Sequence, residues 1–338
     1  MKKVDIKEVA RKSGVSIATV SRVFKNPEKV AEETREKVMY FANKLNYTPN
    51  LAAQALRGSL NNIGVVLTKS ADEAFHNPFY SEVLRGLSAA IDGKNYHIQL
   101  IAYNSIDEEL KEIKKLVGSG RVNGLVVLAS REKEKLIKEL TRDKVKFVVN
   151  GRVSKKYEDE VYTVDTDNIN DSEEAVEKLI SNNRKNILFI NGSMKYFVNI
   201  DRFTGYKNAL EKNNIKLRKN LIIETTENIK DIEKSILKFF DKKISVDGIF
   251  AKDDIRAAIA LKILIEKGIK VPDEIEIIGH NDLFISQILT PKLSTVRVPI
   301  YDMGVILGNQ ILNLLKNNTL KKHIILPTKL ILRETTNC

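Results

Sequence analysis

The sequence predicts a small all-α helix-turn-helix headpiece followed by an α/β body of two doubly wound parallel sheets, arranged as two lobes. Within the first 50 residues, apolar side chains recur at helical spacing on both sides of Gly14. From Asn61 onward, short continuous apolar runs alternate with amphipathic stretches. Such runs are typical of parallel strands that helices cover on both faces. The alternation fills two successive units, and this predicts two lobes that face each other across a cleft.

The stretch from Val15 to Phe24 is expected to form a helix with two chemically different faces. One face is apolar apart from Ser16, which opens the helix and can cap its free N–H groups. The opposite face is small and wettable, and it carries Ile17, Ala18, Ser21 and Arg22. Upstream, Gly14 can adopt the left-handed conformation that a tight turn requires. A helix, a glycine turn and a second helix form the arrangement that reads DNA.

Charge is concentrated at the amino terminus. The chain has 338 residues, enough for two or three domains, and a formal net charge of +12. Residues 1–60 contain 12 lysines and arginines against 6 aspartates and glutamates, so half of the net charge lies in this short segment. Such a segment is attracted to phosphate, and a solubilising surface is the alternative interpretation.

Several classes of protein are disfavoured by composition. Cys338 is the only cysteine, so neither a disulfide framework nor a cysteine metal site can form within one chain. The amino terminus lacks the apolar core of a signal peptide, and no apolar run approaches membrane-spanning length. We therefore expect a cytoplasmic protein with no membrane contact, no metal and no cofactor.

Residues 1–49 are expected to form the DNA-binding headpiece, and residues 50–60 a hinge helix and linker. A third helix is expected from Ala31 to Leu45, and Pro49 ends the unit because the residue before a proline leaves helical geometry. Between Asn50 and Gly58 lies an alanine-rich helix that is too short to be stable alone. It is expected to order only against a partner, and an ordinary helical linker is the alternative.

Residues 61–338 are expected to form the bilobed body, to which the family resemblance given below assigns effector binding and dimerisation. We expect a first lobe of about 61–162 and 293–322, and a second lobe of about 163–292 and 323–338. Ligands of such sheets bind at the carboxyl ends of the strands. The strands are expected at 63–67, 124–128, 147–149, 186–190, 247–251, 275–279 and 329–333.

The chain resembles the lactose-repressor family of bacterial transcription regulators. The resemblance spans essentially all 338 residues. In the amino-terminal part it is carried by Asp5–Ala10, Gly14–Ser16, Ala18–Val23 and Tyr47–Asn50, and in the body by Asp201–Tyr206, Phe250–Asp254 and Ile278–Asp282. It implies a homodimer that binds a pseudo-palindromic double-stranded operator and a small sugar effector held between the lobes.

The resemblance also implies which residues contact DNA. Ser16, Ile17, Ala18 and Arg22 would reach base edges, whereas Thr19, Ser21 and Tyr47 would hold phosphates or brace the helix. Arg22 suits guanine because its fork matches the O6/N7 pair, and a phosphate contact is the alternative. In the hinge, Asn50, Ala53 and Leu56 complete the expected DNA-binding set. Leu56 would act as an apolar wedge that partly unstacks one step of the minor groove.

By the same resemblance, the effector site would combine Phe79 and Asn150 from the first lobe with Arg202, Asp253, Asn281 and Asp282 from the second. Such arginine, aspartate and asparagine side chains bond vicinal hydroxyls, and an aromatic ring stacks on a sugar face. A surface salt bridge for Arg202 and simple core packing for Phe79 are the alternatives.

Two departures from the common family pattern refine the expected effector. Lys252-Asp253-Asp254 stands where many relatives carry Ala-Asn-Asp, and a carboxylate at Asp253 would favour hydroxyl donors and disfavour anions. Residues 70–79 and 279–282 resemble the maltose- and maltodextrin-responsive branch. Thr48 follows Tyr47, where the catabolite-control branch is expected to carry a basic residue, and this argues against a phosphorylated phosphocarrier partner.

The expected function is a transcriptional regulator, most simply a repressor, of a carbohydrate-utilisation operon. A sugar-binding enzyme and a solute-binding protein with the same bilobed body are the alternatives. Against an enzyme, the sequence contains no phosphate-cradling glycine loop, no G-x-S-x-G elbow and no clustered metal ligands. The last expected strand is not followed by a leucine-heptad tail, which predicts a dimer rather than a tetramer.

Overall fold

The computed structural model describes residues 5–25, 27–45, 47, 61–68, 74–103, 106–132, 135–318 and 321–337. The chain divides into two compact units, Met1–Leu60 and Asn61–Cys338. The expected hinge, with Asn50, Ala53 and Leu56, lies outside the described residues. Among the helices of the described ranges, none is both long and apolar enough to cross a membrane.

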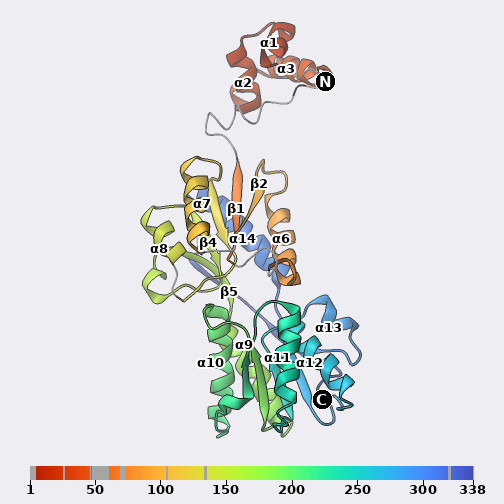
Figure 1. Ribbon diagram of the computed structural model, residues 1–338. Coiled ribbons are helices and arrows are strands. Elements are labelled where there is room, and N and C mark those ends of the chain that lie inside the picture. The colour runs from red at the N-terminus through yellow and green to blue at the C-terminus, as the bar shows by residue number, and fades with distance from the viewer. Residues whose placement is uncertain are drawn as a thin grey trace. The chain divides into compact units, whose positions relative to one another are not determined.

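The first unit is a small helical bundle. Its helices are α1 (Ile6–Ser13), α2 (Ile17–Lys25) and α3 (Glu32–Lys44), with a short 3-10 turn, η1, at Pro27–Lys29 (Figure 1). The three helices share one core, as predicted, made of Val9, Ala10, Val20, Val23, Val38 and Ala42. Helical spacing within the expected third helix also predicts Phe41 in this core, but its ring lies edge-on to that of Tyr40 instead, with ring centroids 5.2 Å apart. Ala42, one position further along α3, is buried in its place.

The second unit contains two α/β lobes, each built on a six-stranded sheet (Figure 1). The first sheet has the order β11-β5-β4-β3-β1-β2, and all its pairings are parallel. Its strands are β1 (Asn62–Leu67), β2 (His97–Ala102), β3 (Gly124–Val127), β4 (Phe147–Asn150), β5 (Tyr162–Thr166) and β11 (His323–Leu326). Helices α6 (Pro78–Ile91) and α14 (Ile300–Leu315) pack on one face, and α7 (Ile106–Gly118) and α8 (Lys135–Arg142) on the other.

The second sheet has the order β12-β10-β9-β8-β6-β7, with only β12 antiparallel to its neighbour. Its strands are β6 (Ile187–Asn191), β7 (Ile222–Glu224), β8 (Gly248–Ala251), β9 (Glu276–Asn281), β10 (Ser294–Arg297) and β12 (Lys329–Ile331). Helices α9 (Asn168–Ser181) and α10 (Phe197–Lys212) cover one face; α11 (Ile229–Phe240) and α12 (Asp254–Glu266) cover the other. A short helix, α13 (Phe284–Ile288), follows β9, and 3-10 turns η2 and η3 lie at Lys155–Tyr157 and Lys219–Leu221. The predicted fold class is confirmed.

The expected lobe boundaries are corrected at three strands. β5, which the sequence assigned almost entirely to the second lobe, pairs with β4 and belongs to the first. β11 was also assigned to the second lobe, but it pairs with β5 in the first. β10 was assigned to the first lobe, but it pairs with β9 in the second. The chain therefore passes between the lobes three times, at β5–α9, β10–α14 and β11–β12. Strand pairing across long separations is set by tertiary packing, which local patterning does not encode.

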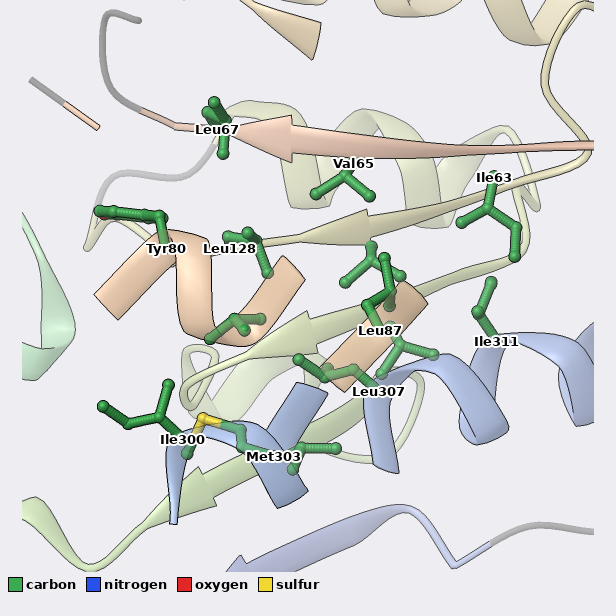
Figure 2. Packing of buried hydrophobic residues seen from close by; sticks show 14 of the residues in the cluster. Ile63, Val65, Leu67, Tyr80, Leu87, Leu128, Ile300, Met303, Leu307 and Ile311 are labelled. Carbon is green, nitrogen blue, oxygen red and sulfur yellow. The ribbon is translucent and has the colours of Figure 1, made fainter. Parts of the chain in front are cut away.

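The core of the first lobe depends on close contact between α6 and α14. Figure 2 shows Leu87 of α6 and Leu307 of α14 among the side chains packed beneath β1. A Cβ atom added at Gly86 would lie 2.0 Å from the carbonyl oxygen of Tyr301, and one at Gly304 would lie 2.2 Å from that of Val83. Glycine is therefore required at both positions, because the two backbones touch there.

Candidate functional site

Helix α2 presents its two faces as predicted. Val20 and Val23 are buried in the helical core, and Phe24 is partly buried beside them. On the other side Ala18 and Arg22 are exposed, and Ile17 keeps 43% of its surface in solvent. Ser21 is half-buried. An exposed isoleucine next to an exposed arginine gives this face an apolar contact and a forked donor together.

The turn before α2 is fixed by two residues. Gly14 ends α1 with φ of 69° and ψ of 27°, the left-handed conformation expected for it. Ser16 Oγ accepts a hydrogen bond of 3.0 Å from the Thr19 amide, so it caps α2. The hydroxyls of Ser16 and Thr19 lie 2.9 Å apart and share a hydrogen bond. Both hydroxyls therefore lie together at the helix start.

Tyr47 braces α2 from behind. Its ring packs edge-on against Phe24, with centroids 5.7 Å apart, and its amide donates to the carbonyl of Ala42. Burial raises the pKa of the Tyr47 phenol, and the charge of Asp5 adds to the shift. The hydroxyl is therefore neutral at physiological pH and available for a hydrogen bond.

A cavity lies between the two lobes of the body. Its walls come from strand ends and helix starts of both sheets, as expected for doubly wound folds. Five of the six expected effector residues line it: Phe79, Asn150, Arg202, Asp253 and Asn281. Asn77 lines it too; its side chain caps α6 by accepting from the Phe79 amide at 3.0 Å. Pro78 follows at the first helical position, where a proline fits best.

Asp282, the sixth expected residue, is not among the residues that line the cavity. Its carboxylate binds Arg297 and Arg333, each at 2.6 Å, and accepts from the Ser286 hydroxyl at 2.8 Å. Burial opposes ionisation, but these partners hold the pKa of Asp282 below its usual value. The backbone explains the divergence, since Asn281 and Asp282 both have positive φ, at 111° and 53°. The chain turns sharply there, and only Asn281 joins the cavity wall.

Arg202 is fixed inside the second lobe. It lies on α10 and is almost fully buried. Its Nε atom donates to Asn168 Oδ1 at 3.1 Å, and its Nη1 donates to the carbonyl of Lys252. Burial lowers its pKa, although surrounding carboxylates oppose the change. The surface salt bridge considered as an alternative does not form with Asp201, which instead binds Arg152 of the first lobe at 2.7 Å.

Asp253 has less capacity for a ligand than the sequence indicates. One oxygen accepts from the Arg256 amide at 3.0 Å and caps α12. The other lies 2.5 Å from Arg256 Nη1 and 3.5 Å from Lys252 Nζ. Burial would raise the pKa of Asp253, but Arg256 and Lys252 lower it overall. Because Glu227 also pairs with Lys252 and Arg256, the four groups form a charge-balanced cluster.

The cavity also contains residues that sequence reasoning missed. Asp165 lies near the end of β5, a strand that was placed in the wrong lobe, and Asn168 is the first residue of α9. Asp165 accepts from the Thr166 amide and the Asn168 side chain, and burial raises its pKa to about 7. Tyr196 and Lys252 contribute from the second lobe. The only available signal was Lys252 itself, a departure from the family pattern.

A strap, formed by residues 130–132 and 195–197, joins the lobes at the cavity wall. The Phe197 amide donates to the Ser130 carbonyl at 3.2 Å, and the Glu132 amide donates to the Lys195 carbonyl at 2.9 Å. The guanidinium of Arg131 lies over the Tyr196 ring, 5.8 Å from its centroid, and pairs with Glu109 Oε2 at 3.0 Å. Ser130, Tyr196 and Phe197 also line the cavity. The strap therefore both links the lobes and forms part of the cavity wall.

Two protein-family models match separate parts of the chain. Residues 5–50 match the model of bacterial regulatory proteins of the lacI family, and residues 176–336 match a periplasmic binding protein-like domain. The regulator RegA of Clostridium saccharobutylicum is 31% identical over 98% of both chains. The chain belongs to the LacI family. The regulator MalR of Streptococcus pneumoniae is 33% identical over 80% of this chain and 82% of its own.

Solved structures show the same fold. The lac repressor dimer bound to operator and an anti-inducer superimposes with a TM-score of 0.84 at 22% identity, covering all of both chains. A complex of the regulator CelR with cellobiose gives 0.75 at 24% identity, covering 98% of this chain and 99% of that one. This LacI-family member is a DNA-binding transcription regulator with an effector domain, and not an enzyme. Within the described ranges, no group of three histidine, cysteine or acidic side chains is placed to hold a metal ion.

Proposed function

We propose that this regulator represses a carbohydrate-utilisation operon and that an uncharged sugar in the interlobe cavity controls its affinity for operator DNA. The observation that carries the proposal is the cavity wall, where hydroxyl-binding side chains alternate with aromatic rings. Phe79, Tyr196 and Phe197 supply rings, and Asn77, Asn150 and Asn281 supply amides. Rings that stack on a sugar face and amides that bind paired hydroxyls are the usual components of such sites.

The balance of charge supports an uncharged ligand. Lys252 and Arg256 are each paired with Glu227 and Asp253, and the carboxylate of Asp165 lies near Arg202. An anionic sugar phosphate would have to displace one of these carboxylates, at the cost of leaving a buried charge unpaired. Maltose or a maltodextrin is the proposed effector, because relatives named MalR are among the most similar in sequence.

We also propose how the headpiece reads DNA. Arg22 and the small surface of Ser16, Ile17 and Ala18 enter the major groove, while Thr19, Ser21 and Tyr47 contact phosphates or brace α2. For the hinge, which lies outside the described residues, the proposal is that Asn50, Ala53 and Leu56 contact DNA and that Leu56 acts as the apolar wedge in the central step. Acting on chromosomal DNA, the protein works in the cytoplasm.

The working form is proposed to be a homodimer, so that two headpieces engage a pseudo-palindromic operator. An apolar surface on the body supports this assembly. On α13, Phe284 keeps 74% of its surface in solvent and Ile288 keeps 61%. Large exposed apolar side chains of this kind mark surfaces that a partner covers.

Calorimetric titration of the full-length protein tests the proposal. Maltose, maltotriose, cellobiose, glucose and glucose 6-phosphate are compared, and Arg202→Lys serves as the site variant. Maltose or maltotriose should bind, glucose 6-phosphate should not, and the variant should bind at least tenfold more weakly because a single ammonium cannot reproduce the fork. Exclusive binding of glucose 6-phosphate would refute the uncharged-ligand proposal. Operator binding that no sugar alters would refute control by sugar.

A further inference from the structure

Two buried polar atoms without hydrogen-bond partners face each other near a crossover between the lobes. His280 is fully buried on β9 and Asp171 is 2% exposed on α9. His280 Nε2 lies 3.8 Å from Asp171 Oδ2, and neither atom has a hydrogen-bond partner. This separation exceeds a hydrogen bond, and leaving both atoms unpaired in the interior is costly. A single proton between them would satisfy both.

The remaining atoms of the pair connect it to the cavity and to a lobe crossover. His280 Nδ1 lies 3.2 Å from Asn281 Oδ1, and Asn281 lines the effector cavity. The other oxygen of Asp171 accepts from the hydroxyl of Thr328, in the crossover between β11 and β12. Asp171, His280 and Asn281 therefore lie in a row from the crossover to the cavity wall, and only the 3.8 Å separation between Asp171 and His280 must shorten for hydrogen bonds to link all three.

We propose that Asp171, His280 and Asn281 form a proton relay that sets whether Asn281 offers a donor or an acceptor to the effector. In the protonated state, the Asp171 carboxyl donates to His280 Nε2, and Nδ1–H donates to Asn281 Oδ1. The asparagine NH2 group is then left for the cavity. When the pair loses one proton, the carboxyl proton passes to Nε2 and the Nδ1 proton leaves to solvent on the cavity side. Nε2–H then donates to the carboxylate, and Nδ1 becomes an acceptor. The Asn281 amide reverses, donates to Nδ1 and turns its oxygen to the cavity.

The charges around the pair favour one shared proton rather than two. Arg202 on α10 faces both residues, and Lys252 also faces His280. Burial and these cations lower the pKa of His280 far below its usual value, so the ring stays neutral. Burial raises the pKa of Asp171 to about 6, against the effects of Thr328 and Arg202 and with smaller contributions from Asp167 and Glu174. Below this pH the additional proton is therefore held by the carboxyl, and the ring does not become an imidazolium.

The relay itself can be tested without any ligand. Full-length protein labelled with 15N in its histidine rings is titrated from pH 5 to 8, and His280 is followed in the variant His76→Gln/His97→Gln/His323→Gln, which retains only that histidine. The ring should stay neutral and pass from the Nδ1–H to the Nε2–H tautomer near pH 6. Asp171→Asn should lock the Nδ1–H tautomer at every pH, because the amide donates permanently to Nε2. Glu174→Gln, which removes an exposed carboxylate from the same helix, should retain the transition.

A single tautomer of His280 across the whole range, or an imidazolium at pH 5, would overturn the relay. So would a tautomer change that survives in Asp171→Asn. Thermal unfolding of each variant, monitored at the same pH values, shows whether the fold is retained.

The consequence for the effector rests on the proposed function and uses maltose as the probe. Arg202 and Lys252 can only donate hydrogen bonds. The Asn281 oxygen, when it is turned to the cavity, adds an acceptor to the wall and so favours ligands with hydroxyl donors. Maltose should bind roughly fivefold more tightly at pH 7.5 than at pH 5.5, the contribution of one hydrogen bond. In Asp171→Asn the affinity should be weak and should lose the part of the pH dependence that comes from the relay, and Asp165→Asn, which removes the other titrating carboxyl of the cavity wall, should retain that part. A pH-independent affinity in the wild type would overturn this link. Absence of maltose binding, with the tautomer change present, would refute the sugar and support the relay.

Discussion

The hydroxyl of Tyr196 in the second lobe donates a hydrogen bond of 3.0 Å to the carbonyl of Thr68 in the first. The same carbonyl accepts from the guanidinium of Arg131, which itself lies over the Tyr196 ring. The Thr68 carbonyl, which directly follows β1, therefore accepts hydrogen bonds from side chains of both lobes. Ser130, Tyr196 and Phe197 of the strap also line the cavity, so these contacts lie beside the space between the lobes.

Tyr196→Phe should loosen the strap without unfolding either lobe. The ring stays under Arg131, but one interlobe hydrogen bond is lost, which amounts to about 1 kcal/mol. The amides of Glu132 and Phe197 donate across the lobes, so their hydrogen exchange should accelerate about fivefold. Tyr96→Phe is the control, because Tyr96 precedes β2 at the opposite end of the strands. Equal exchange in wild type and Tyr196→Phe would argue against the strap as a latch.

Arg22→Ala should reduce operator selectivity by about 10- to 100-fold, since a bidentate contact to guanine provides about 1–3 kcal/mol of discrimination. Competition gel shifts with operator and scrambled DNA measure this ratio. Arg35→Ala on α3 removes the same charge from the headpiece and should weaken binding to both DNAs alike. If Arg22→Ala weakened both DNAs equally, Arg22 would be a phosphate contact instead.

Gly304→Ala should destabilise the body by about 1–3 kcal/mol, the usual cost of overpacking. The new methyl group would meet the carbonyl oxygen of Val83 at 2.2 Å and the amide nitrogen of Leu87 at 3.0 Å, so α6 and α14 must separate. Urea denaturation reports the change. Gly118→Ala, at the end of α7, meets no atom within 4 Å and should be nearly neutral. Equal stability of the two variants would show that the helices part easily.

Asp165→Asn should make the folded state less sensitive to pH. Burial raises the pKa of Asp165 from 3.8 to about 7, so the native state binds a proton more tightly than the unfolded chain. Its contribution to stability is complete below about pH 4 and is lost as pH rises through 7. The variant should therefore gain stability relative to wild type by up to a few kcal/mol at pH 8, and less at pH 5.

Chemical denaturation at both pH values provides the comparison for Asp165→Asn. Asp167→Asn changes an exposed carboxylate two residues away and preserves the cap of α9, since asparagine caps equally well. It should leave the pH dependence almost unchanged. A stability difference between Asp165→Asn and wild type that is constant from pH 5 to 8 would show that the native carboxyl does not titrate in this range.

The local features of the headpiece were readable from the sequence. Helical spacing decides which side of α2 is buried, because 3.6 residues per turn places Val20 and Val23 on one stripe and Ile17 on the other. The left-handed turn at Gly14 could also be predicted from the sequence, because glycine adopts that conformation most easily. Long apolar strands likewise reveal parallel sheets covered on both faces.

Only tertiary structure decided which lobe holds β5, β10 and β11, because Thr163 pairs with His323 across 160 residues and no local pattern encodes that partner. Tertiary structure also decided that Asp282 pairs with Arg297 and Arg333, and that Asp253 pairs with Arg256. The sequence states the chemical type of each side chain. Its remaining hydrogen-bonding capacity depends on neighbours brought close only by folding, and that capacity determines what a cavity can bind.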